Sequence, residues 1–249
     1  MDVINTNLVS LDPAVVIDPL ATEFVIGSTA DGNAVPHATF SMTQSAMNSV
    51  YEIASKLEDA DRSIKALGDK PDPATDARMR KNAQAAMGQA KKTIADTYIS
   101  LSDHAARIAG EADELVGTQH YRAGVTENAR GAEVRQWLRE LSPTLRTDAL
   151  NEALTAKDRE IIASVLAASP VLSGMKREHH SSLANDAHAQ FAPDQHRLMR
   201  GIAKLTKALQ TADGVLMKRY AGITGVGSSR QAEAERAINA LGSLEGSAA

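Results

Sequence analysis

The side chains of this 249-residue chain that are best placed to bind a ligand are basic and lie near its C-terminal end. They follow one another at intervals of three or four residues within a predicted helix: Arg197, Arg200, Lys204 and Lys207. Because an α-helix turns once in ~3.6 residues, they would share a face and could line up against phosphates. Residues 171–222 hold eight bases and four acids, however, a net charge of only +4. Aromatic side chains for base stacking are also few, so nucleic acid is a weakly supported partner.

The N-terminal region offers these cations a different partner. Residues 1–40 contain no Lys or Arg but five acids: Asp2, Asp12, Asp18, Glu23 and Asp31. Opposite charges attract, within one chain or between subunits, so an acidic arm could meet the basic helix. The alternative is that both sets of charges are solvated surface, which is the more common situation for charged side chains.

Four histidines in the same region could hold a metal only if their spacing placed two rings on one face. They are His179, His180, His188 and His196. Zinc-binding helices place two histidines at positions i and i+4, and no two of these are four residues apart. We therefore predict no metal site and interpret these histidines as helix surface.

Other signatures of catalysis and cofactor binding also fail. The chain has no Cys, which excludes disulfides, thiol catalysis and Cys-ligated metals. The glycine-rich stretch 222–229 lacks the Lys of a phosphate-binding loop and follows a helix, so we interpret it as a hinge. No Gly-x-Ser-x-Gly motif is present. We predict that the protein has no catalytic residues, binds no cofactor and is not an enzyme.

The central part of the chain carries the clearest structural pattern. Apolar residues recur there at intervals of seven: Met87, Ile94, Leu101, Ile108 and Leu115. This period predicts one long helix, from about Ala74 to Val116, with one apolar stripe. A shorter helix precedes it, from a capping-box-like start at Ser41 to a break at 68–73. So short a connection predicts that the two helices form an antiparallel coiled-coil hairpin.

The long helix should extend past the end of its partner. If the hairpin folds about residues 70–71, the shorter helix ends opposite Ser100. Leu101, Ile108 and Leu115 then need another partner, either later helices of this chain or another subunit. We therefore predict that these three residues are a partner-docking surface.

The whole chain is expected to be all-α and to consist of four segments. Residues 1–40 form an extended arm that docks and that could contain short β-strands at 14–17 and 23–26. Residues 41–117 form the helical hairpin. Residues 118–222 form a bundle of helices. One is expected to start at Pro143 and the next after the capping-box-like Thr155, and the last runs at about 194–220. Residues 223–249 form a flexible link, a last helix near 230–241 and a tail.

One stretch of the sequence also suggests the biological setting of the protein. The segment Asp158–Met175, with the sequence DREIIASVLAASPVLSGM, resembles a stretch found in uncharacterised helical proteins of tailed bacteriophages. The overall plan is similar to that of phage virion accessory proteins, which implies a virion or assembly role. The resemblance covers under a tenth of the chain and carries over no functional residue.

These expectations combine into a structural role. We expect a non-enzymatic assembly protein that acts through helical packing and oligomerisation, as a homo-oligomer or docked on a larger assembly. The larger assembly that the resemblance suggests is a bacteriophage virion. The alternative is a coiled-coil adaptor or regulatory module that binds a protein or nucleic acid through the basic 194–220 helix. The chain shows neither a basic, apolar leader nor an apolar run long enough for a bilayer, so we expect a cytoplasmic protein. If the protein is phage-derived, this means the host cytoplasm and then the virion.

Overall fold

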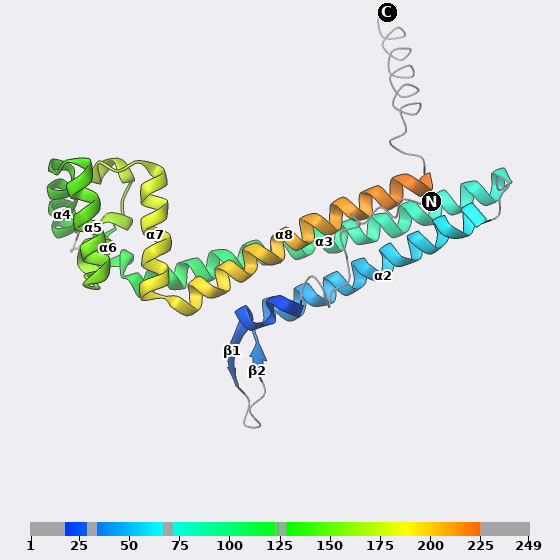
Figure 1. Ribbon diagram of the computed structural model, residues 1–249, viewed down its shortest axis with the longest axis horizontal. Helices are drawn as coiled ribbons and strands as arrows, with labels where there is room; N and C mark the ends of the chain where they lie inside the picture. The colour runs from blue at the N-terminus through cyan, green and yellow to red at the C-terminus, as the bar shows by residue number, and fades with distance from the viewer. Residues whose placement is uncertain (1–17, 29–33, 67–71, 123, 125–127, 225–249) are drawn as a thin grey trace, which may run out of the picture. The chain divides into compact units, whose positions relative to one another are not determined.

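The computed structural model describes residues 18–28, 34–66, 72–122, 124 and 128–224 (Figure 1). These residues form seven α-helices, three short 3-10 helices and one pair of short strands. In chain order the elements are η1 (Asp18–Phe24), β1 (Val25–Ser28), β2 (Ala34–Pro36), α2 (Ala38–Ala66), α3 (Pro73–Val116), η2 (Thr118–Tyr121), α4 (Asn128–Glu140), α5 (Pro143–Thr155), α6 (Arg159–Leu166), η3 (Pro170–Ser173), α7 (Arg177–Phe191) and α8 (Pro193–Thr224). The predicted all-α class is confirmed.

The chain divides into two compact units. Unit 1 contains residues 1–22, 26–100 and 205–249, and unit 2 contains residues 23–25 and 101–204. The helices α3 and α8 each contribute to both units, and the division cuts α3 after Ser100. Among the described helices, none combines the length and the apolar composition that crossing a bilayer requires.

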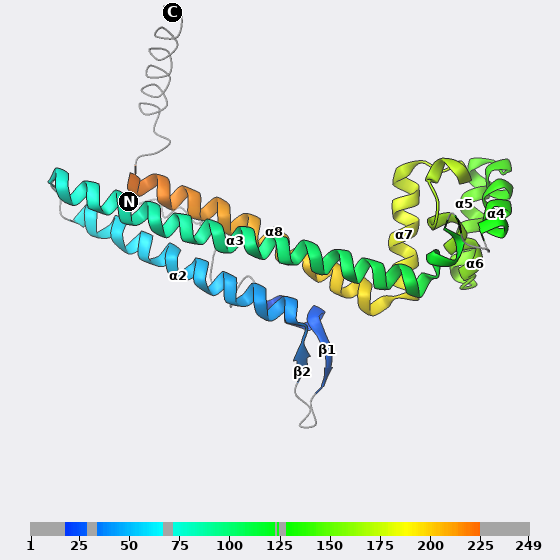
Figure 2. The ribbon, with the colours of Figure 1, turned by 180° about the vertical axis from the view of Figure 1, so that it is seen from behind.

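Three helices lie side by side in unit 1: α2, the first part of α3 and the last part of α8 (Figures 1 and 2). Each contributes apolar residues spaced three or four apart, as packing along a helix face requires. The buried residues include Met47, Val50, Ala54 and Leu57 on α2, Ala83, Met87, Ala90 and Ile94 on α3, and Leu205, Leu209, Ala212 and Leu216 on α8. An ion pair between Arg219 and Glu58, 3.3 Å long, also joins α8 to α2.

Two side-chain hydrogen bonds define how α3 and α8 align in unit 1. Arg80 Nη1 donates to the Thr224 carbonyl (3.1 Å), and Tyr98 Oη donates to the Thr206 carbonyl (3.3 Å). The two contacts lie 18 residues apart on each helix, in opposite directions, so the helices are antiparallel and in constant register. Burial, and then the charge of Asp213, raise the pKa of Tyr98, which keeps the phenol protonated as a donor.

The stripe on α3 continues into unit 2, where α8 lies alongside it in both views (Figures 1 and 2). Leu101 and Ile108 are each 1% exposed in the single chain, so of the two partners left open it is the chain itself that covers them. Neither is available as a docking residue in this state. Leu115 is 43% exposed instead, and the neighbouring Val116 is fully buried. A straight helix drifts by ~20° per heptad, so the fifth position of a strict seven-residue repeat has turned outward.

The core of unit 2 is built around the short helix α6. Its residues Ile162, Ala163, Ser164 and Val165 are buried in succession, so the helix is covered all round rather than on one face. The other buried members of this core are Val116, Leu138, Leu150, Ala153, Leu183, Ala187 and Phe191. On α4, Trp137 is 44% exposed, whereas the next residue, Leu138, is fully buried.

The helix starts in unit 2 follow the predicted chemistry with one correction. Ser142 caps α5 by accepting a hydrogen bond from Leu145 N, and Pro143 occupies the first turn. The cap of α6 is Asp158, which accepts from Ile161 N, and not Thr155, which closes the preceding helix. Lys157, which lies between the two helices, has φ +57°, in the left-handed region that non-glycine residues rarely adopt.

The N-terminal region differs from the prediction in detail. The strands β1 and β2 pair with each other, but only the second expected strand, 23–26, overlaps one of them. Helix α2 begins at Ala38 rather than Ser41, because His37 Nδ1 accepts a hydrogen bond from Thr39 N (3.2 Å). Helix α8 continues to Thr224, so it includes Gly222 of the expected hinge. The expected strand at 14–17, the rest of the hinge and the last helix lie outside the described residues.

Arg146 joins three segments of unit 2. Its Nε donates to the Leu138 carbonyl (2.8 Å) and its Nη2 to the Leu141 carbonyl (2.9 Å), at the C-terminal end of α4. Its Nη1 donates to the Gly174 carbonyl in the connection to α7. A cation at this position adds hydrogen bonds to carbonyls at the end of α4 and complements the negative end of the helix dipole.

We predict that Arg146→Ala destabilises unit 2 by about 2 kcal/mol, because it removes several hydrogen bonds from a charged donor. Arg139→Ala is the matched control, since Arg139 is an exposed basic residue on the last turn of α4, close in sequence to Arg146, and should change stability by less than ~0.5 kcal/mol. Urea unfolding followed by circular dichroism measures both. Equal losses for the two variants would show that Arg146 does not have this role.

Candidate arm-docking site on helix α8

Three consecutive residues near the N-terminus, Glu23–Val25, contact one face of α8; we call them the arm segment. Glu23 forms an ion pair with Lys204, and the Phe24 ring lies against Gly201. The Val25 carbonyl accepts a hydrogen bond from Arg197 Nη2 (3.0 Å). The three α8 residues follow at intervals of four and three, which places them on one face of the helix. The arm segment therefore runs antiparallel to α8.

The aromatic contact depends on the absence of a side chain at Gly201. A Cβ atom there would lie 2.5 Å from Phe24 Cζ and 2.6 Å from Cε2, far inside van der Waals contact. Phe24 is fully buried, so its ring has no solvent to move into without leaving the site. Glycine thus opens a notch in the side of α8, and the ring fills it.

The polar contacts flank this notch. Arg197 also donates to Asp194 Oδ1 (3.0 Å), which holds its guanidinium between its own helix and the arm segment. The side chains of Lys204 and Glu23 are 44% and 20% exposed. Glu23 Oε2 is buried and accepts no hydrogen bond from the described residues. The ionic part of the contact is therefore partly screened and incompletely satisfied.

A comparison of the expected interaction energies identifies the Phe24 ring as the dominant contact. Full burial of a phenylalanine contributes about 2–3 kcal/mol. A partly exposed ion pair contributes up to about 1 kcal/mol, and the Arg197 hydrogen bond about 1.5 kcal/mol at its exposed position. The unpaired Glu23 oxygen opposes them by about 1–3 kcal/mol. The net stabilisation is only a few kcal/mol and disappears without the ring.

The structure divides the four basic residues that the sequence singled out. Arg197 and Lys204 contact the arm segment. Arg200 and Lys207 are exposed, and no ion pair joins either of them to another residue in the described part of the chain. The acidic arm and the basic helix therefore meet within one chain, through Glu23, which was one of the interpretations left open.

Sequence reasoning did not identify the central pair, Phe24 and Gly201. A signal was present, because an isolated glycine inside a strongly periodic helix usually has a packing reason. What the sequence could not show is which distant side chain fills the notch.

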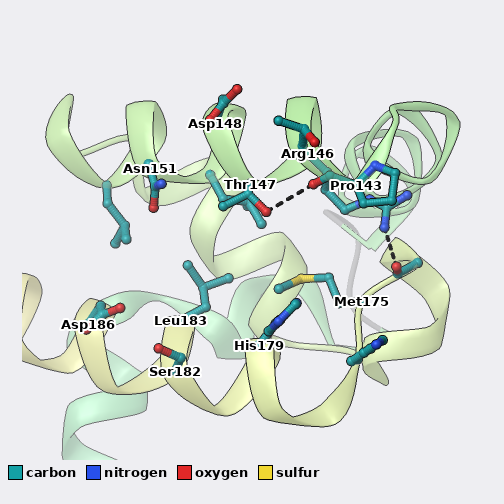
Figure 3. Close-up of a pocket in the computed structure, with 15 residues that line it drawn as sticks. Pro143, Arg146, Thr147, Asp148, Asn151, Met175, His179, Ser182, Leu183 and Asp186 are labelled. Atoms are coloured by element: carbon teal, nitrogen blue, oxygen red, sulfur yellow. Dashed lines mark hydrogen bonds between the residues drawn. The ribbon is translucent and has the colours of Figure 1, made fainter.

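Unit 2 also contains a groove of about 570 Å³ between α5 and α7 (Figure 3). Leu150, Leu154, Met175 and Leu183 supply apolar lining. In Figure 3, Thr147 and Asn151 lie on the α5 side, and His179, Ser182 and Asp186 on the α7 side. Arg146 also lines the groove, but its guanidinium donates to the backbone carbonyls described above. The groove is thus lined by apolar, acidic and basic side chains together.

The histidines of this region have separate partners. His180 Nε2 lies 3.3 Å from the Val165 carbonyl, His188 Nε2 3.1 Å from Asp113 Oδ1, and His196 Nε2 3.0 Å from Asn185 Oδ1. His179 lines the groove. Among the described residues, no three His, Asp or Glu side chains come together in a group that could hold a metal ion.

We predict that Gly201→Ala displaces the arm segment, because the added methyl group overlaps the Phe24 ring. Loss of the contact should lower the protection of the β1 amides roughly 10- to 100-fold, as expected for a few kcal/mol, in hydrogen exchange followed by mass spectrometry. Gly214→Ala is the matched control. Gly214 lies on the same helix with nothing within 4 Å of its notional Cβ, so this variant should leave β1 protected. Unchanged protection in Gly201→Ala would contradict the notch.

The relative strength of the contacts that hold the arm segment is a second prediction. Phe24→Ala should reduce the protection of the β1 amides at least tenfold, whereas Lys204→Gln should reduce it only a few-fold, because its ion pair is partly exposed. Lys207→Gln, one turn further on, should have no effect. The Lys204→Gln effect should also vanish in about 1 M salt. A larger effect for Lys204 than for Phe24 would mean that charge, not ring burial, holds the arm.

The comparisons with known proteins give no relative from which a role for the arm-docking site could be inferred. No protein-family model matches this chain, and neither does any curated protein or solved structure. The resemblance of residues 158–175 to phage proteins stays a prediction, and in the structure these residues form α6, η3 and the connection to α7. The function must therefore be inferred from the geometry of the arm-docking site and the surfaces around it.

Proposed function

We propose that this protein is a non-enzymatic assembly protein that acts through helical packing and oligomerisation. The setting that the sequence resemblance suggests is the virion of a tailed bacteriophage. The observation that carries the proposal is the arm segment on α8. Two of the four candidate ligand-binding cations, Arg197 and Lys204, are engaged by a segment of protein and not left open to a ligand.

Exposed apolar side chains support a role in contacts with other proteins. Several large ones in unit 2 remain at least 40% exposed: Leu115, Trp137, Leu145, Val171 and Leu172. Scattered exposed apolar residues are normal, but aromatic and aliphatic anchors of this kind are what protein interfaces bury. An assembly protein would cover part of this surface when it binds its neighbours.

The proposal predicts self-association. In size-exclusion chromatography with light scattering, and in native mass spectrometry, the purified protein should exceed its monomer mass of 26.4 kDa, by a factor that grows with concentration. A monomer at all accessible concentrations would contradict oligomerisation. Co-purification with a defined particle, seen by electron microscopy, would separate docking on a larger assembly from self-assembly.

The second candidate function is an adaptor that binds nucleic acid through α8, and it is favoured by one observation only. Arg200 and Lys207 are exposed on the helix. We expect no retention on DNA or RNA at low salt, because two free cations release too few counterions for stable binding. Salt-sensitive binding that is lost in Arg200→Gln/Lys207→Gln, but retained in the control Lys218→Gln, would instead establish this function.

A further inference from the structure

We infer that the groove between α5 and α7 is a docking site for residues 230–241 of a second copy of the chain. The inference rests on the proposed assembly function and names a surface through which copies would associate. The ligand is a slender, alanine-rich amphipathic helix with acidic side chains in its first half. Residues 230–241 lie outside the described part of the chain, and their helix is the one that the sequence predicts.

α5 and α7 form the two walls of the groove and run in the same direction. Arg146, near the start of α5, donates a hydrogen bond to the Gly174 carbonyl just before α7, so both helices start at the same end of the groove. Figure 3 shows Asn151 of α5 and Asp186 of α7 near the other end. From Lys176 to Asp186 the α7 wall is ~15 Å long, nearly three helical turns. The groove therefore has the length and the parallel walls that a short third helix requires.

The floor of the groove is apolar and its rims are polar. Leu150 and Leu183 belong to the core of unit 2, and Leu154 and Met175 are half-buried beside them. Ser182, on the α7 rim, is exposed. A space of about 570 Å³ is far larger than the voids within a close-packed core, so it can admit the side chains of a partner.

The cations around the groove gather at one end. Lys176 and His179 line the start of the α7 wall with exposed side chains, and no described acidic side chain forms an ion pair with either. Arg146 adds positive charge at the same end. Of the lining acids, Asp186 is at the opposite end and Asp148 points away from α7 in Figure 3. An occupant with carboxylates in its first half would therefore bind in one orientation, parallel to α7.

Residues 230–241 carry the matching pattern. Their apolar side chains are spaced as i, i+3, i+4 and i+7 and would share one helix face: Ala234, Ala237, Ile238 and Leu241. Glu233 and Glu235 flank this face in the first half of the segment. Ala232 and Ala240 keep the rest of the helix slender, and small side chains let two helices approach closely.

The match also specifies a register. Glu235 lies beside His179 when the acidic half of the segment meets the basic end of the groove. A parallel helix then places Ile238 over Leu183, because both helices advance by ~1.5 Å per residue. The apolar face covers the apolar floor, and the carboxylates meet the cations.

The chain's own segment is too far away to fill this groove. α8 is one continuous helix, so Thr224 lies ~46 Å from Pro193 at its other end. α7 ends at Phe191, just before α8 begins, and turns away from α8 in both views (Figures 1 and 2). Residues 225–229 can span only ~20 Å even when fully extended. The docked segment therefore comes from a second copy, and each copy offers both a segment and a groove.

Substitutions in the segment test the inference in the full chain. Leu241→Asn should weaken self-association at least roughly tenfold in light scattering, because it places an amide on the apolar floor. Ala232→Asn is the matched control on the opposite face of the same helix, and it should change association by less than about twofold.

Substitutions in the groove test the other side of the contact. Ser182→Trp should weaken association as much as Leu241→Asn does, because the indole fills the space. Ser181→Trp is the control, since Ser181 is the neighbouring exposed serine and does not line the groove. Circular dichroism checks that both variants keep their helices.

A cross-link identifies the source of the segment, because the native chain contains no Cys. One preparation would carry Asn239→Cys and be labelled with ¹⁵N, and the other would carry Ser182→Cys. The proposed register places these two positions side by side. After mixing at assembly concentration, a short bismaleimide should yield a mixed dimer in which one chain is labelled.

The outcomes are distinguishable. Loss of association in Leu241→Asn and Ser182→Trp, together with the mixed dimer, supports the docking. An oligomer that survives both substitutions overturns it and leaves the proposed assembly function standing. Cross-linking within one chain of the double variant Asn239→Cys/Ser182→Cys, with no mixed dimer, assigns the groove to the chain's own segment and overturns docking between copies. A protein that stays monomeric at every concentration overturns both proposals.

Discussion

The packing of one long amphipathic helix, α8, is the constraint on which the rest of the structure depends. Its buried residues recur at intervals of three and four along the helix: Leu198, Ile202, Leu205, Leu209, Ala212 and Leu216. Such a stripe must be covered, and in unit 1 it packs with α3 in an antiparallel register that Tyr98 and Arg80 mark. Because the packing stripe uses one side of α8, another side is left for the arm segment.

Periodicity and capping made much of this fold predictable from sequence. The long helix was expected from Ala74 to Val116 and runs from Pro73 to Val116, since a sustained apolar period leaves little choice of element. The start of α5 at Pro143 was also predictable, because proline fits the first turn of a helix. The exposure of Leu115 was not predictable from a repeat of seven, because it depends on how far a straight helix drifts from that repeat.

The candidate site was predictable only in part, because the residues that form it lie far apart along the chain. Opposite charges on the arm and on α8 indicated an attraction, which Glu23 and Lys204 make across 181 residues. The sequence contained no means of choosing that pair from the other acids and bases. The fit of Phe24 to Gly201 is harder still, because it depends on shape, and shape exists only after both helices have packed.

The arm segment binds α8 through contacts that are specific but weak. The Lys204 side chain of the ion pair is 44% exposed, and one Glu23 oxygen has no hydrogen-bond partner among the described residues. A contact worth a few kcal/mol opens more readily than a helical core, so the arm segment should leave α8 before either unit unfolds. The ring in the notch supplies specificity, and the partly satisfied charges keep the binding reversible.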